Sequence, residues 1–538
     1  MPNMPLPSAC RRRPWPAKNR HAGLLPRVPP MTARALSCVL AGIVARPIEV
    51  EVDVAGGLPH FTIVGLPGGA VRESKDRVRA ALRNAGHPAP ERRITVNLAP
   101  AHLRKEGAAF DLAIAAALLV ADARLPERCL DGALVVGELS LDGGLKPLHG
   151  VLPMAVAARR AGAARLLLPA ANASEAALVE GLEVLGLDSL GHAIDVLAGR
   201  AAAVPTRLDP RTLLHEPRPG DVDFADVRGQ AVARRALEIA AAGGHNVLLL
   251  GPPGSGKTML ARRLPTILPE MSLDEALEAT AVHSVAGLLG DAPLLATRPF
   301  RAPHHTASEA ALVGGGRLVR PGEVSLAHRG VLFLDELPEF PVATLEALRQ
   351  PLEERRIAVS RASGCHVFPA DALVVAAMNP CPCGYLGDPT HLCSCPPGTA
   401  ARYRQRISGP LLDRLDLHVE VPALPWADLV GTSRGEGSGV IRARVCAARR
   451  RQAERLSRPG THCNAHMNGR EIDRYCVLDP ACERLLETAV ERLGLSARAF
   501  SRVRKVARTI ADLAGRERLD AGDVAEALQY RALDRRTT

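Results

Sequence analysis

Apolar positions in the first two hundred residues fall into short runs that alternate with Ala-rich helical stretches. Runs that alternate apolar and polar residues, or that are wholly apolar, are typical of β-strands. The pattern therefore predicts one self-contained α+β domain over residues 31–200. Its expected strands are residues 48–54, 60–64, 93–98, 133–136 and 166–168.

A change of pattern separates this domain from two further units. Residues 201–222 hold prolines at positions 205, 210, 217 and 219, and proline cannot donate a backbone hydrogen bond, so a linker is predicted. From residue 223 to 430, strand, turn and helix repeat in the order of a doubly wound parallel sheet. Gly- and Ser-rich residues 431–439 predict a hinge, and residues 440–538 a helical domain. Its helices are expected at 440–456, 480–493, 497–513 and 521–530.

The composition agrees with an α/β fold and indicates a class of partner. Hydrophobic residues make up 47% of the 538 residues but aromatic residues only 3%, so the cores are expected to consist of Ala, Val and Leu. The formal net charge of +11 suits a polyanion such as nucleic acid. The Arg-rich composition of the whole chain is an alternative explanation for that charge.

Three features bear on the cellular compartment. The longest apolar run, residues 112–121, is about half as long as a bilayer span requires, so no membrane partner is expected. Residues 1–30 hold basic residues and prolines without the apolar stretch of a secretion signal, and are interpreted as a disordered tail or as sequence before a true start at Met31. Twelve scattered cysteines favour the reducing cytoplasm.

A strand at residues 246–250 runs directly into a glycine-rich loop and a helix. Backbone N–H groups of such a loop surround phosphates at the helix N-terminus, while the lysine neutralises the β and γ oxygens and the threonine hydroxyl binds Mg²⁺. The sequence therefore predicts a binding site for Mg²⁺ and ATP. Its residues are Gly251, Pro252, Pro253, Gly254, Ser255, Gly256, Lys257 and Thr258.

Two further strands deliver polar side chains to the same edge of the sheet. Residues 331–334 end in Asp335, expected in the Mg²⁺ shell, and Glu336, expected to orient and deprotonate the attacking water. Residues 373–378 deliver Asn379, which can bond the γ-phosphate and the water, or simply form a turn before Pro380.

Hydrolysis in such a site also needs a cation to stabilise the charge that develops on the phosphoryl group. Arg414 is the first candidate. Arg498, in the C-terminal helices, is the second and is expected to reach back as that domain closes over the nucleotide. Since the chain is rich in arginine, a solvated helix face is the alternative for both.

Several long segments resemble the magnesium-chelatase-like AAA+ ATPase family of the ComM and YifB type, over nearly the whole chain from Met31. They are 57–67 (GLPHFTIVGLP), 94–100 (ITVNLAP), 300–308 (FRAPHHTAS), 322–330 (GEVSLAHRG), 408–414 (SGPLLDR) and 496–500 (SARAF). The resemblance implies a homo-hexameric ring, Arg414 as a finger supplied in trans, and Arg498 as a second sensor. It also implies DNA branch migration in homologous recombination and natural transformation, with recombination proteins as partners. A chelatase-type ATPase subunit, which usually lacks such a first domain, and a nucleotide-switched scaffold or transcription adaptor are the other hypotheses.

A candidate DNA-binding surface follows from the segment 356–368, which reads as a β-hairpin with Arg361 in its turn. Helicase-type relatives point a similar hairpin into the ring pore, and basic residues there could contact a DNA backbone. The candidates are Arg361, His304, His305, Arg317 and Arg320. A solvated hairpin with core histidines is the alternative.

The Arg-rich helix 442–458 could track phosphates, line a subunit interface or face solvent.

Residues 31–200 resemble the proteolytic domain of Lon-type proteases. Gly143, Gly144, Leu145 and Lys146 match the segment of the Lon catalytic lysine, but Ala109 stands where the nucleophilic serine would be. Without a hydroxyl there is nothing for a lysine to activate, so peptidase activity is not expected.

Four cysteines cluster after the strand that delivers Asn379. Cys381, Cys383, Cys393 and Cys395 lie in one Gly- and Pro-rich loop and suit a tetrahedral structural Zn²⁺. Their one-residue gaps are less common than two-residue gaps, and Cys365 or His391 could replace a ligand. Four free thiols in an irregular loop are the alternative.

Overall fold

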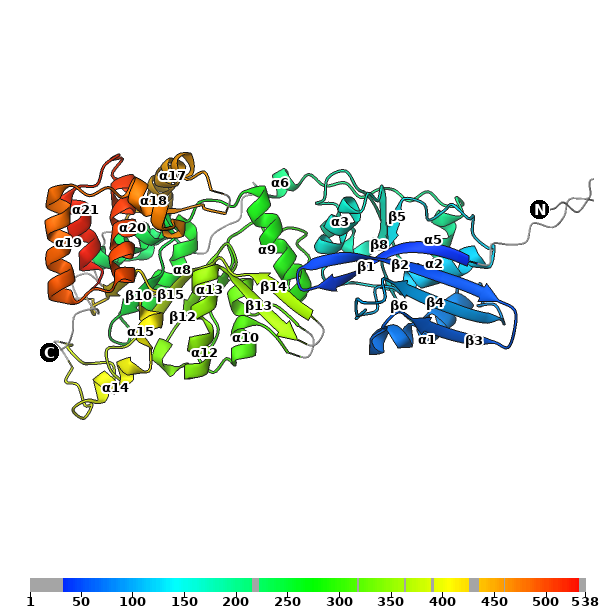
Figure 1. Cartoon of the computed structure of the whole chain (residues 1–538), viewed down its shortest axis with the longest axis horizontal. Helices are drawn as coiled ribbons and strands as arrows, with labels where there is room; N and C mark the ends of the chain where they lie inside the picture. Colours follow the sequence, from blue (N-terminus) through cyan, green and yellow to red (C-terminus); the bar gives the residue numbers. More distant parts are fainter. Residues whose placement is uncertain are drawn as a thin grey trace, which may run out of the picture.

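The computed structural model describes residues 32–214, 222–316, 319–361, 364–388, 391–424, 435–458 and 460–531. The predicted tail, the first part of the predicted hinge, residues 215–221 of the predicted linker, and Arg317 lie outside these residues. The chain forms an elongated molecule, with the N-terminal domain at one end, the last helices at the other and a second sheet between them (Figure 1).

The N-terminal domain is built on a seven-stranded mixed sheet of order β3-β4-β2-β1-β5-β8-β9. β1, β2 and β4 pair antiparallel, and the remaining neighbours pair in parallel. The strands are β1 (Thr32–Ala41), β2 (Val44–Ala55), β3 (His60–Val64), β4 (Arg93–Ala99), β5 (Ala133–Val135), β8 (Arg165–Pro169) and β9 (Glu183–Leu187). Every predicted strand is present, whereas β1 and β9 were not predicted.

The helices of this domain are α1 (Gly69–Asn84), α2 (Asp111–Ala121), α3 (Val151–Arg160), α4 (Ala173–Ala176) and α5 (Leu190–Leu197). All residues of α2 are buried, which explains its uninterrupted apolar sequence. A short hairpin of β6 (Glu138–Leu139) and β7 (Leu145–Lys146) follows β5.

The described part of the predicted linker contains regular structure. Thr206 forms a bridge to Val184 beside β9, and α6 (Pro210–Leu214) begins at a proline. Proline is tolerated at the first position of a helix because the N–H there has no partner in the helix, so Pro210 starts a helix rather than preventing one.

The N-terminal domain docks on the second domain through a small apolar cluster. Leu152 of α3 and Leu178 pack against Met271 and Ala276 at the start of α9 (Leu273–Ala286). Polar contacts add to it, because Glu175 of α4 accepts hydrogen bonds from the Ser284 hydroxyl and the Leu152 backbone. The two domains therefore share a packed interface.

The second domain holds a five-stranded, wholly parallel sheet of order β11-β12-β15-β10-β16. The strands are β10 (Val247–Leu250), β11 (Phe300–Arg301), β12 (Val331–Leu334), β15 (Leu373–Met378) and β16 (Leu417–Glu420). Alternate residues of these strands enter two separate hydrophobic clusters, one on each face. This confirms the predicted parallel sheet with both faces covered.

The helices of this domain lie on both faces of the sheet. They are α7 (Ala231–Gly243), α8 (Lys257–Ile267), α9, α10 (Glu309–Val313), α11 (Glu323–Leu326), α12 (Val342–Ala347), α13 (Arg349–Glu354), α14 (Thr399–Gln405) and α15 (Gly409–Leu412). Between α13 and β15 the predicted hairpin is present as β13 (Arg356–Arg361) and β14 (Gly364–Pro369).

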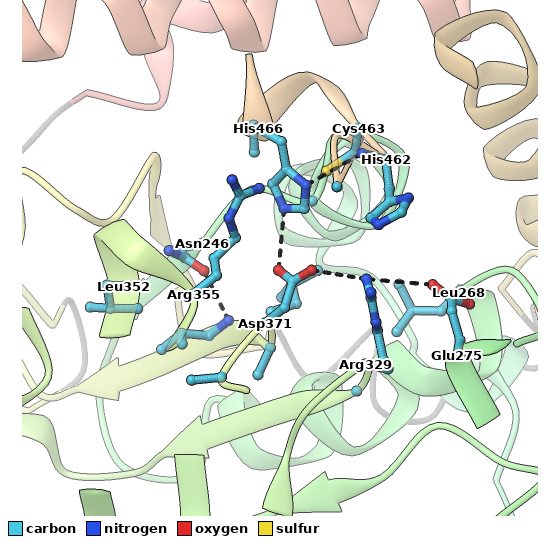
Figure 2. A pocket seen from close by; sticks show the side chains of 18 of the residues that line it. Asn246, Leu268, Glu275, Arg329, Leu352, Arg355, Asp371, His462, Cys463 and His466 are labelled. Atoms are coloured by element: carbon cyan, nitrogen blue, oxygen red, sulfur yellow. Dashed lines mark hydrogen bonds and ion pairs between the residues drawn. The ribbon is translucent and has the colours of Figure 1, made fainter. Parts of the chain in front are cut away.

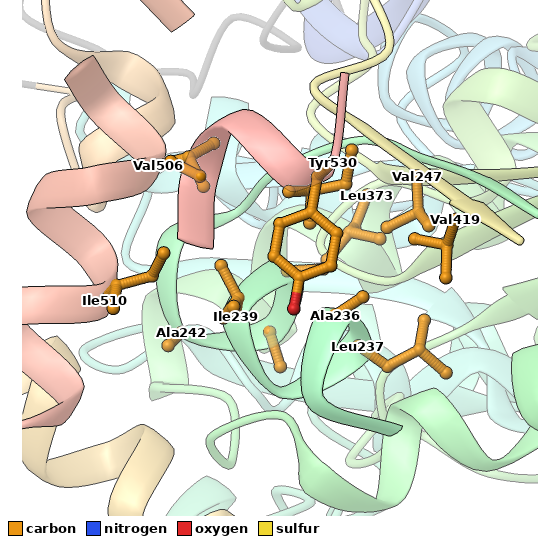
Figure 3. Packing of buried hydrophobic residues seen from close by; sticks show 14 of the residues in the cluster. Ala236, Leu237, Ile239, Ala242, Val247, Leu373, Val419, Val506, Ile510 and Tyr530 are labelled. Atoms are coloured by element: carbon orange, nitrogen blue, oxygen red, sulfur yellow. The ribbon is translucent and has the colours of Figure 1, made fainter. Parts of the chain in front are cut away.

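The C-terminal region is helical, as predicted. Its helices are α17 (Ser438–Arg455), α18 (Gly469–Tyr475), α19 (Pro480–Leu493), α20 (Ala497–Leu513) and α21 (Ala521–Gln529). Only the short α18 was not predicted. These helices share one hydrophobic cluster with α7, α8 and one sheet face, and Tyr530 lies in it against Ile239, Leu373 and Val419 (Figure 3).

Candidate functional site

The phosphate loop joins β10 to α8 at the carboxyl edge of the parallel sheet, where ligands of such folds bind. Gly254 and Gly256 have φ angles of +78° and +92°, a backbone region that glycine adopts without strain. Ser255 Oγ is buried and has no hydrogen-bond partner among the described residues. A loop with two glycines of positive φ and an unpartnered serine hydroxyl fits a phosphate group, which the sequence predicts here.

Lys257 points back over this loop. Its Nζ donates hydrogen bonds to the carbonyl oxygens of Gly251 (2.8 Å) and Pro252 (2.9 Å), and to Asn379 Oδ1 (3.2 Å). Burial lowers the pKa of this ammonium, while the charges of Asp335 and Glu336 act to raise it. A buried ammonium attracts an anionic ligand, and two neighbouring carboxylates attract a cation. This arrangement therefore suits an anion that binds together with a metal ion.

The predicted Mg²⁺ ligands lie within hydrogen-bond distance of each other. Thr258 Oγ1 donates to Asp335 Oδ2 at 2.9 Å, and Asp335 Oδ1 accepts the Glu336 N–H at 3.0 Å. A hydroxyl and a carboxylate are oxygen donors of the kind that Mg²⁺ prefers. When bound, Mg²⁺ would neutralise phosphate charge, and these two residues would hold it.

Glu336 has an unusual backbone and a partner that sequence reasoning assigned elsewhere. Its φ is +51°, in the left-handed region, and its carboxylate lies 3.0 Å from Nδ1 of His305. The ring of His304 packs on that of His305, with centroids 4.1 Å apart. The histidine pair therefore lies at the nucleotide site rather than on the hairpin surface.

Arg414 and Arg498 lie at the opposite edge of the same sheet. Arg414 precedes β16, and its carbonyl accepts a hydrogen bond from Asn246, which precedes β10. Arg414 Nη2 pairs with Glu353, and Arg498 Nη2 lies 4.0 Å from the other oxygen of that carboxylate. Within one chain, neither guanidinium is on the phosphate-loop side.

The candidate DNA residues divide into two places. Gly315 bridges to Arg320, and a side chain at Gly315 would lie 3.3 Å from the Arg361 guanidinium. Arg361 and Arg320 are therefore both neighbours of Gly315, apart from the two histidines. On β14, His366 packs beside Gly42, so the hairpin lies between the core and the β1–β2 turn (Figure 1).

The Arg-rich helix α17 binds mainly to its own chain. Arg444 pairs with Glu238 and Glu436, Arg455 pairs with Asp512, and Arg449 donates to the Ala241 carbonyl. None of the three interpretations of this helix anticipated these contacts, which hold it to its own chain.

The four clustered cysteines converge in space. The Sγ atoms of Cys381 and Cys383 are 3.3 Å apart, and Cys393 Sγ lies 3.7 Å and 3.5 Å from them. All four sulfurs, including that of Cys395, lie within 4.8 Å of one another. Tetrahedral zinc with Zn–S bonds of ~2.3 Å places its sulfurs about 3.8 Å apart, so the group fits structural Zn²⁺.

This cysteine loop touches the phosphate loop. Gly384 has a φ of +89°, and a Cβ there would come within 2.5 Å of the Pro253 ring. This contact was not predicted from the sequence, since the two segments are over a hundred residues apart and a glycine shows a close approach only in the folded chain.

In the N-terminal domain the two positions compared with Lon-type proteases are close. The Ala109 carbonyl accepts a hydrogen bond from the Gly137 N–H, and the next residue, Glu138, pairs across β6 and β7 with the exposed Lys146. The methyl group of Ala109 is buried and carries no nucleophile.

Family models of magnesium chelatase match most of the chain. The model described as magnesium chelatase, subunit ChlI, covers residues 223–429, a model of subunit ChlI of Mg-chelatase covers residues 50–172, and one of its C-terminal region covers residues 435–531. Together with the parallel sheet and phosphate loop, these matches define a magnesium-chelatase-type ATPase.

Curated relatives narrow this class. The chain is 46% identical to the competence protein ComM of Haemophilus influenzae over 496 residues, 92% of this chain and 96% of the relative. It is 45% identical to YifB of Escherichia coli K12 over 499 residues, with the same two coverages. An uncharacterized protein of Mycobacterium tuberculosis H37Rv is 46% identical over 501 residues, 93% of this chain and 98% of that protein. The chain therefore belongs to the ComM/YifB family of magnesium-chelatase-like proteins.

Among the residues that the structure describes, no helix is long and apolar enough to cross a membrane.

Proposed function

We propose that the chain is the subunit of a ring-shaped DNA motor that hydrolyses Mg-ATP in the cytoplasm. The observation that carries the proposal is the convergence of Lys257, Thr258, Asp335, Glu336 and Asn379 at one edge of the parallel sheet. ATP is the substrate of this site, and its triphosphate would occupy the loop that Lys257 now spans.

Each residue has a distinct task in this mechanism. Lys257 exchanges its bonds to loop carbonyls for bonds to the β and γ oxygens, and Thr258 and Asp335 would hold Mg²⁺, which would neutralise phosphate charge. Once the Glu336 carboxylate has left His305, it accepts the proton of the attacking water. Asn379 aligns that water with the phosphorus. The only charge still required is a cation that meets the developing negative charge.

Arg414 supplies that cation to a neighbouring subunit. Because Arg414 and Arg498 share Glu353 at the edge opposite the phosphate loop, they reach a nucleotide only if a second chain presents its own loop to that face. This geometry favours a closed homo-oligomer, for which the hexamer is the expected form, with ATP between subunits.

DNA is the proposed polymer on which the ring acts, in branch migration during recombination and natural transformation. Arg361, at the end of β13, and Arg320 both lie beside Gly315, as cations that contact a phosphate backbone would. The relative named a competence protein aligns along 92% of this chain. A magnesium-chelatase 67 kDa subunit of Chlorobaculum tepidum aligns with only 30% of it, at 29% identity, which makes chelatase activity the weaker hypothesis.

The test is ATP hydrolysis by the purified chain with magnesium, alone and with single-stranded or four-way branched DNA. The proposal expects branched DNA to stimulate hydrolysis, and Lys257→Ala to abolish hydrolysis and strand exchange. ATPase activity that DNA does not change would contradict the DNA-motor hypothesis but not the ATPase hypothesis. The scaffold and chelatase hypotheses would then be tested next.

A further inference from the structure

A cavity of about 1290 Å³ opens at the amino edge of the core sheet, on the side away from the phosphate loop. Its floor is formed by residues that precede or begin strands, such as Asn246 and Leu373, and its roof by the segment between α17 and α18. Exposed side chains, including Glu270 and Glu353, border it, so small solutes have a route inside.

Three side chains in this cavity form a line of the kind that activates a thiol (Figure 2). Cys463 hydrogen-bonds to the ring of His466, and Nε2 of the same ring lies 3.2 Å from Asp371 Oδ1. The other oxygen of Asp371 lies 3.0 Å from Arg329 Nη1. The Asp371 carboxylate thus orients the His466 imidazole, which contacts the Cys463 sulfur. Thiol chemistry uses these three groups as the orienting group, the base and the nucleophile.

The backbone brings the sulfur to this place. Gly244 has a φ of +72°, and a Cβ there would lie 2.5 Å from Cys463 Sγ. The absence of a side chain at Gly244 therefore leaves room for the thiol between the end of α7 and the cavity.

The charges around the pair favour the ionised form. Burial opposes ionisation of the Cys463 thiol, but the charges of His466 and Arg449 and the hydrogen bond to His466 lower its pKa to about 6. Burial likewise opposes protonation of His466, yet Cys463 and Asp371 raise its pKa to about 9. Between these values the pair is a thiolate and an imidazolium.

Other groups that face the pair come from several elements. Arg449 of α17 donates to the carbonyls of Ala241 and His462, and half-buried Lys505 of α20 lines the same cavity, with its pKa lowered by desolvation. His462 lines the same cavity and its pKa is lowered by burial. Arg355 also lines it, and its Nη1 is buried without a hydrogen-bond partner among the described residues.

We propose that Cys463, activated by His466 and Asp371, is a modification site that reacts with small electrophiles entering this cavity, above all hydrogen peroxide. The sulfur attacks one peroxide oxygen, so an S–O bond forms and the O–O bond breaks. The sulfur is oxidised to a sulfenic acid, and the peroxide is reduced. The departing hydroxide takes the proton of His466 and leaves as water, while the free donor of Arg355 stabilises its charge.

The expected gain is modest at neutral pH and larger in mild acid. At pH 6 about half of Cys463 is ionised, against roughly 0.3% of a thiol with an ordinary pKa of ~8.5. The lower basicity of the thiolate costs roughly ten- to twentyfold in nucleophilicity. The net advantage is therefore about tenfold at pH 6.

The experiment labels the zinc-loaded full chain at pH values from 5 to 9. One arm uses iodoacetamide, and the other uses peroxide followed by a sulfenic-acid probe. Peptide mass spectrometry measures the labelling of each cysteine. Cys446 lines the same cavity outside the His466–Asp371 pair and is the internal control. The proposal expects Cys463 to react about tenfold faster than Cys446 at pH 6, with a half-maximal rate near pH 6.

Two variants separate activation from mere exposure. His466→Gln should move the half-maximal rate above pH 8 and lower the rate at pH 6 about tenfold, while His462→Gln, a matched change at the neighbouring imidazole, should leave both unchanged. Equal labelling of Cys463 and Cys446 at pH 6 in the unmodified chain would overturn the proposal, and that arm needs no variant to fold. An unchanged pH profile in folded His466→Gln would also overturn it.

Discussion

Nδ1 of His305 lies 3.0 Å from a carboxylate oxygen of Glu336, the residue proposed to activate the lytic water. The two side chains come from segments 31 positions apart and meet at the carboxyl edge of the sheet. Because the imidazole holds one oxygen of this carboxylate, the contact restrains the orientation of the Glu336 side chain.

Removal of this restraint is expected to raise basal activity. The pair is partly exposed, with 30% and 51% of the two side chains accessible, so its strength is about 0.5–1 kcal/mol after solvent screening. His305→Ala should therefore raise ATP hydrolysis without DNA about two- to fivefold and reduce the stimulation by DNA. His304→Ala is the matched control, because His304 bonds Thr306 instead. Lower basal hydrolysis in His305→Ala would mean that the imidazole positions Glu336 for catalysis.

Arg414 is expected to act across a subunit boundary. Arg414→Ala should lower ATP hydrolysis at least ~1000-fold while ATP still binds, as for other arginine fingers. Lys257→Ala should be equally inactive for a different reason, the loss of phosphate binding.

Mixing these two inactive chains gives the decisive comparison. Rings that contain both variants place an intact Arg414 beside an intact phosphate loop at some interfaces, so part of the activity should return. A mixture as inactive as its components, although gel filtration shows mixed rings, would contradict action in trans.

Arg361 is expected to contact the DNA backbone. Arg361→Ala should weaken binding of all DNA sequences alike and reduce the slope of log affinity against log salt by about 1, which fluorescence anisotropy at several salt concentrations measures. Arg356→Ala, at the base of the same hairpin and paired with Glu354, should change neither quantity. Equal effects of the two substitutions on DNA binding would contradict a direct contact of Arg361 with DNA and would indicate that the hairpin has only a structural role.

The cysteine group is expected to bind one zinc ion per chain, measurable by mass spectrometry of metals. Cys381→Ser should abolish the zinc and, because Gly384 lies against Pro253, also weaken ATP binding. Cys365→Ser is the matched control, since Cys365 is exposed on β14. Purified chain without zinc, or full zinc content in Cys381→Ser, would reject this metal site.

The sequence predicted β12 and β15 residue for residue, because wholly apolar strands that are buried on both faces differ sharply from the polar residues around them. The strand β1 was not predicted, since its alternation of Thr32, Arg34 and small residues is weak without its partner β2. The seven-residue α18 was also missed, although Asn468 and Glu471 form a capping box that could have indicated it.

The site was predictable where its residues follow strands in the sequence. Lys257, Thr258, Asp335 and Asn379 meet because parallel strands bring their carboxyl ends to one edge. The contact of His305 with Glu336 depends on how the loop after β11 folds, and no local pattern encodes it. The cavity thiol pair likewise needs Asp371, about ninety residues before Cys463 in the chain.

Steady-state hydrolysis of Mg-ATP by the unmodified chain and by Glu336→Gln, with nucleotide binding measured on the same samples, tests the central claim most directly. The account predicts that Glu336→Gln binds ATP as tightly as the unmodified chain and hydrolyses it ~100- to 10,000-fold more slowly, as the loss of a general base requires. Hydrolysis at an undiminished rate in Glu336→Gln, or none in the unmodified chain, would contradict it.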